Sequence, residues 1–202
     1  MTPRTEPAAG YGKPAADGEW RIDGGGWWYH CYDGTYPKNE WKEINGQTYR
    51  FDGNGYMLTG WQYIENEWYY MNSSGARLSG CWLELGGVWY YLKEDGKMAV
   101  GWHLDGTTWY YMDPSGWMRT GWVLVGDTWY YMYPSGMMAT GWALVGDTWY
   151  YLTPGNGAMA TGWLLLGNTW YYLTPGNGAM VTGTQVIDGV EYTFFSDGRC
   201  DW

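Results

Sequence analysis

Short runs of strand-forming residues, interrupted at regular intervals by Gly, Asp, Pro and Ser, make up most of this chain. The segment 121–140, GWVLVGDTWYYMYPSGMMAT, contains two such runs, 122–125 and 128–132, joined by the pair Gly126-Asp127. Two runs rich in aromatic and β-branched residues with a two-residue loop of this kind predict a β-hairpin. The Pro, Ser and Gly cluster that follows is expected to end the second strand.

The same phrase occurs six times between Trp61 and Gly183, with a period of 20 or 21 residues. Repeats of this length bury their apolar faces against their neighbours. Aligned on the first tryptophan, the repeats begin at Trp20, Trp41, Trp61, Trp82, Trp102, Trp122, Trp142, Trp163 and a degenerate Thr184. Because an isolated hairpin is at best marginally stable in water, the nine repeats are expected to stack into an all-β solenoid of hairpins.

Counting outward from the turn assigns each side chain of the hairpin to a face. Val125 lies opposite Thr128, and Trp122 lies opposite Tyr131. Period-two alternation divides the side chains into two groups, Trp122, Leu124, Trp129 and Tyr131 on one face and Val123, Val125, Tyr130 and Met132 on the other. The company of two valines favours a core role for Tyr130 and Met132.

The tryptophan face favours a binding role. The indoles of Trp122 and Trp129 are diagonal neighbours at roughly 7–8 Å. Trp is seldom completely buried, so these two rings with Tyr131 are expected to form an open box. A box of aromatic faces without a partner charge suits a quaternary ammonium group, which is held by cation–π attraction and shape. From these residues alone, either Tyr131 or Tyr151 of the next repeat is able to close the box.

Composition and charge limit the classes of binding partner expected for the chain. The chain has 18 Trp and 21 Tyr but only 3 Phe, and a formal net charge of -10 with 11 Lys and Arg. The charge argues against nucleic acid and anionic membranes and favours cationic ligands. No run approaches the ~18 apolar residues of a transmembrane segment, and the N-terminus lacks the pattern of an export signal. Residues 1–18 are interpreted as a flexible linker rich in Pro, Ala and Gly.

The candidate catalytic and metal-binding residues form no coherent set. His30 and Cys31 are neighbours on a predicted strand, so their side chains point to opposite faces. Cys31, Cys81 and Cys200 are odd in number and lack metal-ligand spacing, so no disulfide framework is expected. Calcium-loop fragments after Phe51 and Met112 do not continue to the carboxylates such a loop needs. We therefore predict no catalytic residue, no metal and no cofactor.

The repeated phrase GW-x6-WYY-[LM]-x4or5-G-x-M-x-TG resembles the choline-binding repeat of pneumococcal-type surface proteins, autolysins and phage lysins. Residues 28–57 are similar to the first repeats of a choline-binding amidase. The resemblance covers most of the chain, and its elements recur in fixed order and spacing. It implies a left-handed superhelix of hairpins in which choline lies between consecutive repeats. Two tryptophans of one repeat and the second WYY tyrosine of the next would form each cage.

Carried over by position, the resemblance implies five complete cages. They are Trp61, Trp68 and Tyr91; Trp82, Trp89 and Tyr111; Trp102, Trp109 and Tyr131; Trp122, Trp129 and Tyr151; and Trp142, Trp149 and Tyr172. The methionines of the GxM elements are candidates for a fourth wall, with gap-filling core packing as the alternative. These methionines are Met98, Met118, Met138, Met159 and Met180.

The terminal repeats depart from the pattern. Thr48 takes the place of a cage tryptophan beside Trp41 and Tyr70. Arg50 replaces the tyrosine expected for Trp20 and Trp27, and an arginine there would repel a cation. Thr193 likewise stands in place of the tyrosine expected for Trp163 and Trp170. Residues 20–60 and 184–202 are therefore expected to cap a binding module that spans 19–202.

The functional prediction is a non-catalytic module that binds choline or phosphocholine of teichoic and lipoteichoic acids. It would anchor a surface protein or wall hydrolase outside a Gram-positive cell, or belong to a phage lysin. A terminal repeat is the candidate surface for a homodimer. The alternative is a glucan-binding array of the toxin and glucosyltransferase type, whose style residues 44–60 share. A hydrolase or adhesin domain preceding the linker is compatible with choline binding.

Overall fold

The structure, a computed structural model, describes residues 17–201, and over this range it contains only β-strands, turns and loops. Each repeat forms one antiparallel hairpin. The nine hairpins are β1 (Gly18–Asp23) with β2 (Gly26–Cys31), β3 (Trp41–Ile44) with β4 (Gln47–Arg50), β5 (Gly60–Ile64) with β6 (Glu67–Met71), β7 (Cys81–Leu85) with β8 (Val88–Leu92), β9 (Gly101–Asp105) with β10 (Thr108–Met112), β11 (Gly121–Val125) with β12 (Thr128–Met132), β13 (Gly141–Val145) with β14 (Thr148–Leu152), β15 (Gly162–Leu166) with β16 (Thr169–Leu173), and β17 (Gly183–Ile187) with β18 (Val190–Phe194).

A short final strand, β19 (Cys200–Asp201), pairs with β18 and extends the last hairpin to three strands. Within the described range no helix is long and apolar enough to cross a membrane. The predicted linker, residues 1–18, falls almost wholly outside the described residues, which begin at position 17.

The predicted register of the hairpins is confirmed. Val125 pairs with Thr128 and Trp122 with Tyr131, so the loop is the two-residue Gly126-Asp127. In this loop only the glycine has a positive φ, 60°, which is the pattern of a type II′ turn. In the corresponding loop of β5 and β6, Glu65 and Asn66 both have positive φ, 52° and 66°, as a type I′ turn requires. Both turn types match the twist of the flanking strands.

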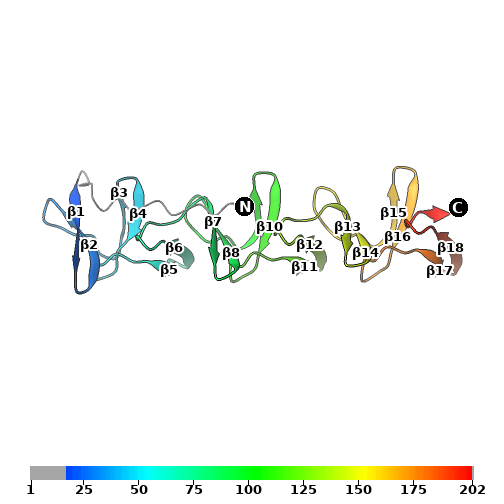
Figure 1. Cartoon of the computed structure of the whole chain (residues 1–202), viewed down its shortest axis with the longest axis horizontal. Helices are drawn as coiled ribbons and strands as arrows, with labels where there is room; N and C mark the ends of the chain where they lie inside the picture. The colour runs from blue at the N-terminus through cyan, green and yellow to red at the C-terminus, as the bar shows by residue number, and fades with distance from the viewer. Residues whose placement is uncertain (1–16, 202) are drawn as a thin grey trace. The chain divides into compact units, whose positions relative to one another are not determined.

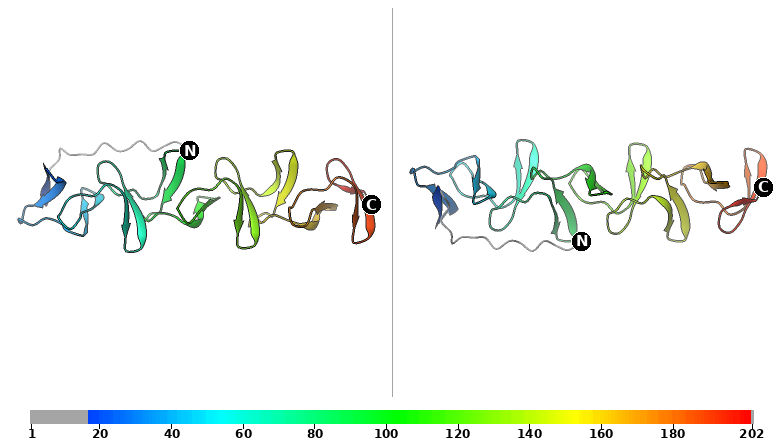
Figure 2. Two further views of the ribbon diagram at one scale, coloured as in Figure 1. Left: turned by 90° about the horizontal axis from the view of Figure 1, so that it is seen from below. Right: turned by 90° about the horizontal axis from the view of Figure 1, so that it is seen from above.

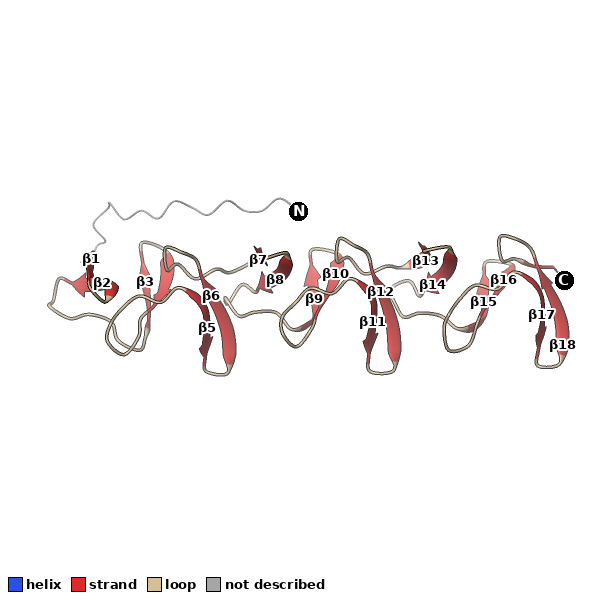
Figure 3. Cartoon of the chain, turned by 60° about the horizontal axis from the view of Figure 1, so that its bottom comes forward, coloured by secondary structure: helices blue, strands red, loops and turns tan. Residues whose placement is uncertain are grey.

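The hairpins belong to two compact units, residues 17–101 with 112–118 and residues 102–111 with 119–201. Within each unit the hairpins follow one another in chain order (Figures 1 and 2). In the second unit, β11–β12 and β17–β18 project in the same direction, while the two hairpins between them project elsewhere (Figure 3). Hairpin orientation in this unit therefore recurs at the third hairpin along the chain. The predicted left-handed sense of the superhelix and the predicted domain boundaries stay predictions.

The core runs along the end of the second strand of each hairpin. The residue that ends the second strand, or directly follows it in the case of Phe51, is completely buried in successive repeats, with an exposure of 0% for Phe51, Met71, Leu92, Met112, Met132, Leu152 and Leu173. Each pairs with a residue of the loop that follows its own hairpin, as Met132 does with Met138 and Leu152 with Met159. Burying a side chain of this size contributes roughly 1.5–3 kcal/mol, so the repeated buried residue stabilises the stack.

Backbone hydrogen bonds join consecutive repeats. The amide of Met159 donates to the carbonyl oxygen of Trp129 in the preceding hairpin at 2.8 Å, while Ala160 donates to Tyr151 of its own hairpin at 2.8 Å. The same bond to the preceding repeat recurs at 2.7–2.9 Å from Met57 to Trp27, Arg77 to Thr48, Met98 to Trp68, Met118 to Trp89, Met138 to Trp109 and Met180 to Trp149. The predicted fold class, an all-β array of stacked hairpins, is confirmed.

Candidate functional site

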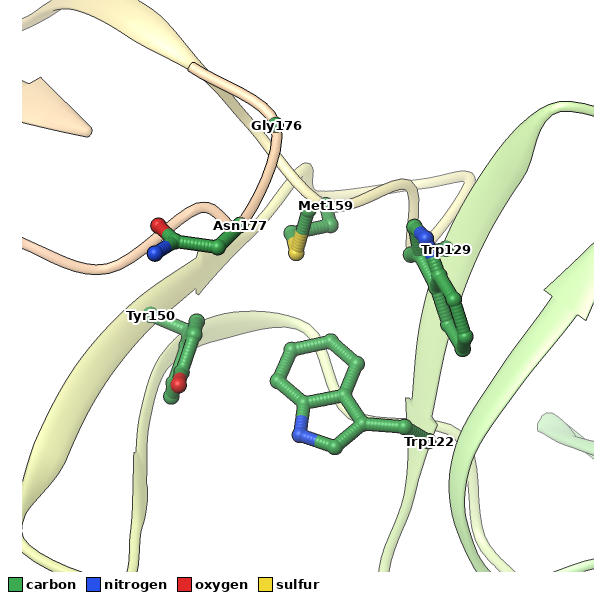
Figure 4. Close-up of a pocket in the computed structure, with 6 residues that line it drawn as sticks. All are labelled: Trp122, Trp129, Tyr150, Met159, Gly176 and Asn177. Atoms are coloured by element: carbon green, nitrogen blue, oxygen red, sulfur yellow. The ribbon is translucent and has the colours of Figure 1, made fainter. Parts of the chain in front are cut away.

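A cavity of about 280 Å³ opens between the Trp122 repeat and the repeat that follows it. Trp122 and Trp129 come from β11 and β12, with ring centroids 6.4 Å apart and planes at 87°. Tyr150 of β14 closes the opposite side, 4.7 Å from Trp122, and Met159 contributes the fourth side chain. The four side chains surround one open space (Figure 4). We call such a set of two tryptophans, a tyrosine and a methionine a cage.

A third repeat completes the rim of this cavity. Gly176 and Asn177, in the loop after β16, line it together with the four cage residues. Gly178 lies next to them with a φ of 72°, and a Cβ atom there would come within 2.5 Å of the sulfur of Met159. Only a glycine allows the loop of the third repeat to approach the methionine so closely. Each cavity therefore depends on three consecutive repeats.

Two more cavities have the same construction. One, of about 280 Å³, is lined by Trp102, Trp109, Tyr130, Met138, Gly155 and Asn156. The other, of about 410 Å³, is lined by Trp61, Trp68, Tyr90, Met98, Pro114 and Ser115. A fourth set lies around Trp142, whose ring centroid is 6.4 Å from that of Trp149 and 4.9 Å from that of Tyr171. The Met180 amide bonds to Trp149 in this set as in the others.

None of the six residues that line the Trp122 cavity carries a charge. Trp129 is 38% exposed, so part of its indole is available to solvent. The opening leads to aromatic faces, which present negative electrostatic potential, and to a polarizable methionine. This arrangement can hold a compact cation by its apolar surface, without an ion pair.

The identity of the cage tyrosine corrects the sequence prediction. The resemblance predicts that the second WYY tyrosine faces the tryptophans of the preceding repeat. In the structure this tyrosine packs on the first tryptophan of its own hairpin. The centroid distances are 5.2 Å for Tyr91 and Trp82, 5.1 Å for Tyr111 and Trp102, 5.1 Å for Tyr131 and Trp122, 5.2 Å for Tyr151 and Trp142, and 5.0 Å for Tyr172 and Trp163. The cavities are lined by the first tyrosine, Tyr90, Tyr130 and Tyr150.

Alternation along the strand explains the correction. Tyr131 shares a face with Trp122, so it packs within its hairpin. Tyr130 points to the other face, which meets the tryptophan face of the preceding repeat, and its ring lies 4.7 Å from Trp102. The interpretation of Tyr130 and its equivalents as core holds in part: Tyr130 is half-buried and lines a cavity, whereas its equivalents Tyr69 and Tyr110 are only 9% and 5% exposed. The core interpretation of Met132 is confirmed by its complete burial. The cage predicted from Trp82 and Trp89 combines residues of both compact units, and it stays a prediction.

The methionines lie where a fourth wall was expected. Met98, Met138 and Met159 each line a cavity. Met118 and Met180 make the same backbone bond to the preceding repeat. The alternative, gap-filling packing, also holds in part, because Met98 is only 8% exposed.

Both ends of the array contain aromatic sets that the sequence analysis assigned to caps. At the first repeat, Trp20 lies 4.8 Å from Tyr49, and the Met57 amide donates to Trp27 at 2.7 Å. At the last, Trp163 lies 6.0 Å from Trp170 and 4.8 Å from Tyr192. Cys200 packs against this last set, at the position of a cage methionine. Arg50 and Thr193, on which the cap assignment rests, occupy the place of the second tyrosine in these repeats, and that assignment stays a prediction.

A polar cavity of about 470 Å³ at the first hairpin contains Cys31. It also contains Asp17 and Lys42, whose charged atoms are 2.7 Å apart. The Lys42 hydrogen bond lowers the pKa of Asp17, and a hydrogen bond from Tyr29 lowers it further. His30 is not among the lining residues, and its ring lies 5.9 Å from that of Trp28. This cavity has no aromatic cage and brings no histidine to the thiol.

The stacked hairpins and the aromatic cavities between them define a hairpin-repeat protein, and comparison with known families agrees. A model described as choline-binding repeat matches residues 38–82 and 119–162. A second, described as putative cell wall binding repeat, matches 82–98, 100–118 and 161–180. Together they cover well over half of the chain. The chain therefore belongs to the choline-binding repeat family, as the repeated phrase predicted.

Solved structures from Streptococcus pneumoniae are similar throughout. CbpJ from strain TIGR4 is 38% identical with a TM-score of 0.79, and the match covers 87% of this chain and 62% of CbpJ. Choline-binding protein F is 36% identical with a TM-score of 0.77, over 87% of this chain and 61% of that protein. The choline-binding domain of CbpL is 33% identical with a TM-score of 0.68, over 91% and 96%. The chain thus spans about three fifths of the first two relatives. Comparison with curated protein sequences gave no match.

The close approach of Gly178 to Met159 predicts a specific loss of stability. Gly178→Ala is expected to lower the free energy of unfolding by about 1–3 kcal/mol more than Gly183→Ala, because only the first forces a methyl group into packed atoms. Both glycines have a φ of 72°, and a Cβ at Gly183 meets nothing within 4 Å, so the backbone strain is matched. Urea unfolding without ligand measures the difference. Equal losses would show that the third repeat does not support the cage methionine.

Proposed function

We propose that the chain is a non-catalytic module that holds choline groups in the cages between consecutive repeats. The observation that carries this proposal is the uncharged cavity of Trp122, Trp129, Tyr150 and Met159, with a centroid distance of 4.7 Å between Trp122 and Tyr150. Membership of the choline-binding repeat family supports the same ligand.

The chemistry of choline matches this cavity. A trimethylammonium group cannot donate a hydrogen bond from its nitrogen. Carboxylates lining the site would therefore lose their hydration without gaining a hydrogen bond from the ligand. Aromatic faces attract the cation and also bury its methyl groups. The formal net charge of -10 adds a long-range attraction for the trimethylammonium cation itself.

Repetition of the cage points to a polymeric ligand. We infer that several cages bind phosphocholine groups on one teichoic or lipoteichoic acid chain at the surface of a Gram-positive cell. Linked sites can raise avidity by roughly 10²–10⁴ over a single site. The end sets around Trp20 and Trp163 are candidate sites of the same kind. Such a module anchors whatever domain it is attached to.

The first prediction concerns the cation. Choline is expected to bind more tightly than 3,3-dimethylbutanol, its uncharged analogue of similar shape, by about 0.5–2 kcal/mol per site. Isothermal titration calorimetry of the chain with each compound provides the comparison. Absence of heat with choline would refute the proposed function. Equal affinities would show that shape and apolar burial suffice without cation–π attraction.

The second prediction assigns one site to residues of two repeats. Trp129→Ala and Tyr150→Ala are each expected to remove about one equivalent of choline, because each removes one wall of the same cavity. The double variant should lose no more than either single variant, since only one site is involved. Calorimetric stoichiometry measures all three.

Trp117→Ala provides the matched control. Trp117 is 45% exposed, similar to Trp129, and it is not among the residues that line the three described cage cavities. Its loss should leave the stoichiometry unchanged. Two equivalents lost in the double variant would mean that Trp129 and Tyr150 serve different sites.

A further inference from the structure

The Trp41 repeat has a cation of its own at the place of the cage. Here Thr48 stands where other repeats have the second tryptophan, and Arg77 stands where they have the methionine. The Arg77 amide donates to the carbonyl of Thr48 at 2.8 Å, which is the bond that cage methionines make to the preceding repeat. Tyr69 lies 5.0 Å from Trp41, as a cage tyrosine does. The backbone frame of a cage is thus preserved.

The side chain of Arg77 extends over the cage tryptophan. Its guanidinium carbon lies 5.4 Å from the ring centroid of Trp41, within the range of a cation–π contact. A Cβ at Gly96 would meet Arg77 Nε at 2.6 Å, just as Gly178 approaches the Met159 sulfur. The loop of the third repeat therefore packs closely against the arginine, as it packs against methionine in the other cages. An arginine is longer than a methionine, so its charged end reaches the ring.

The surroundings favour a guanidinium at this point. Thr48 is much smaller than the tryptophan that other repeats have at this position. Arg77 Nε is buried and has no hydrogen-bond partner among the described residues, so the aromatic face is its compensating contact. Glu43 lies directly across the hairpin from Thr48, on the same face as Trp41. Arg50, paired with Trp41 in the position of the second tyrosine, also stacks on that ring, at 5.7 Å.

We infer that the Trp41 cage is filled by the chain's own Arg77 and takes no external cation. The internal guanidinium joins two repeats without ligand, in the place where the other cages offer their aromatic faces to solvent. The candidate set at Trp20 is then separated from the run of cages that begins at Trp61. The identity of the excluded ligand rests on the proposed function, whereas the stacking of Arg77 does not.

Restoring the repeat motif tests this inference. The triple variant Thr48→Trp, Arg50→Tyr, Arg77→Met is expected to bind one more equivalent of choline than the unmodified chain, by calorimetry. The matched double variant Thr48→Trp, Arg50→Tyr keeps Arg77 and should bind no additional choline. An extra equivalent in the double variant would show that Arg77 does not fill the cage. A folded triple variant without an extra equivalent would show that the position is not a cage.

Nuclear magnetic resonance of the unmodified chain gives a readout that needs no additional site. The Cδ protons of Arg77 should be shifted upfield by the Trp41 ring, and Trp41→Leu should abolish the shift. Arg21→Met is the control, because Arg21 lies 5.6 Å over Trp28, outside the cages, and its loss should leave the Arg77 shift intact. Random-coil Arg77 shifts, or loss of the shift on adding choline, would overturn the inference. If the unmodified chain binds no choline, the proposed function fails while this readout still decides the stacking.

Discussion

The hydrogen bond between the loop methionine of one repeat and the second tryptophan of the preceding repeat is the contact on which the rest of the structure depends. A hairpin of five-residue strands cannot bury enough surface to be stable alone. The Met159 amide, 2.8 Å from the Trp129 carbonyl, fixes how the next hairpin is placed on the first. With that placement fixed, the tryptophan face of one hairpin meets the face of the next hairpin that carries the first WYY tyrosine. A cavity between a tryptophan face and a tyrosine face follows.

Under the proposed function, this arrangement links ligand binding to stacking. The Trp122 cavity takes residues from three consecutive repeats, so a ligand there contacts a folded array and not a single hairpin. A ligand that binds only the stacked form stabilises it in proportion to ligand concentration. Where the cage is filled from within, as at Trp41, the same attraction acts without a ligand. Under the two proposals, the chain uses one kind of contact between repeats in two ways.

Much of the fold follows from the sequence because its signals are local. The Gly126-Asp127 pair set the register, and the register set which side chains share a face. The identity of the cage tyrosine is harder to predict from the sequence, because it depends on which face of the next hairpin turns toward the tryptophans. Alternation along the strand places Tyr130 on the other face from Trp122, and this is the face that meets the preceding repeat. The repeat motif has two adjacent tyrosines, Tyr130 and Tyr131, and the motif alone does not distinguish which of them faces the preceding repeat.

The terminal repeats differ from the inner repeats at the same position. Arg50 and Thr193 stand in place of the second tyrosine, and the capping role expected from them stays a prediction. Tyr49 and Tyr192, one residue earlier in each case, lie 4.8 Å from those tryptophans. The contact of Arg77 with Trp41 had no local signal, because it joins residues 36 positions apart through the stacking of two repeats.

A crystal structure of the chain with choline tests the central claim most directly. The account predicts trimethylammonium density enclosed by Trp122 and Trp129 of one repeat and by Tyr150 and Met159 of the next. It predicts no such density at Trp41, where Arg77 lies. Density that contacts Trp122, Trp129 and Tyr131 of a single hairpin, without Tyr150, would contradict the account.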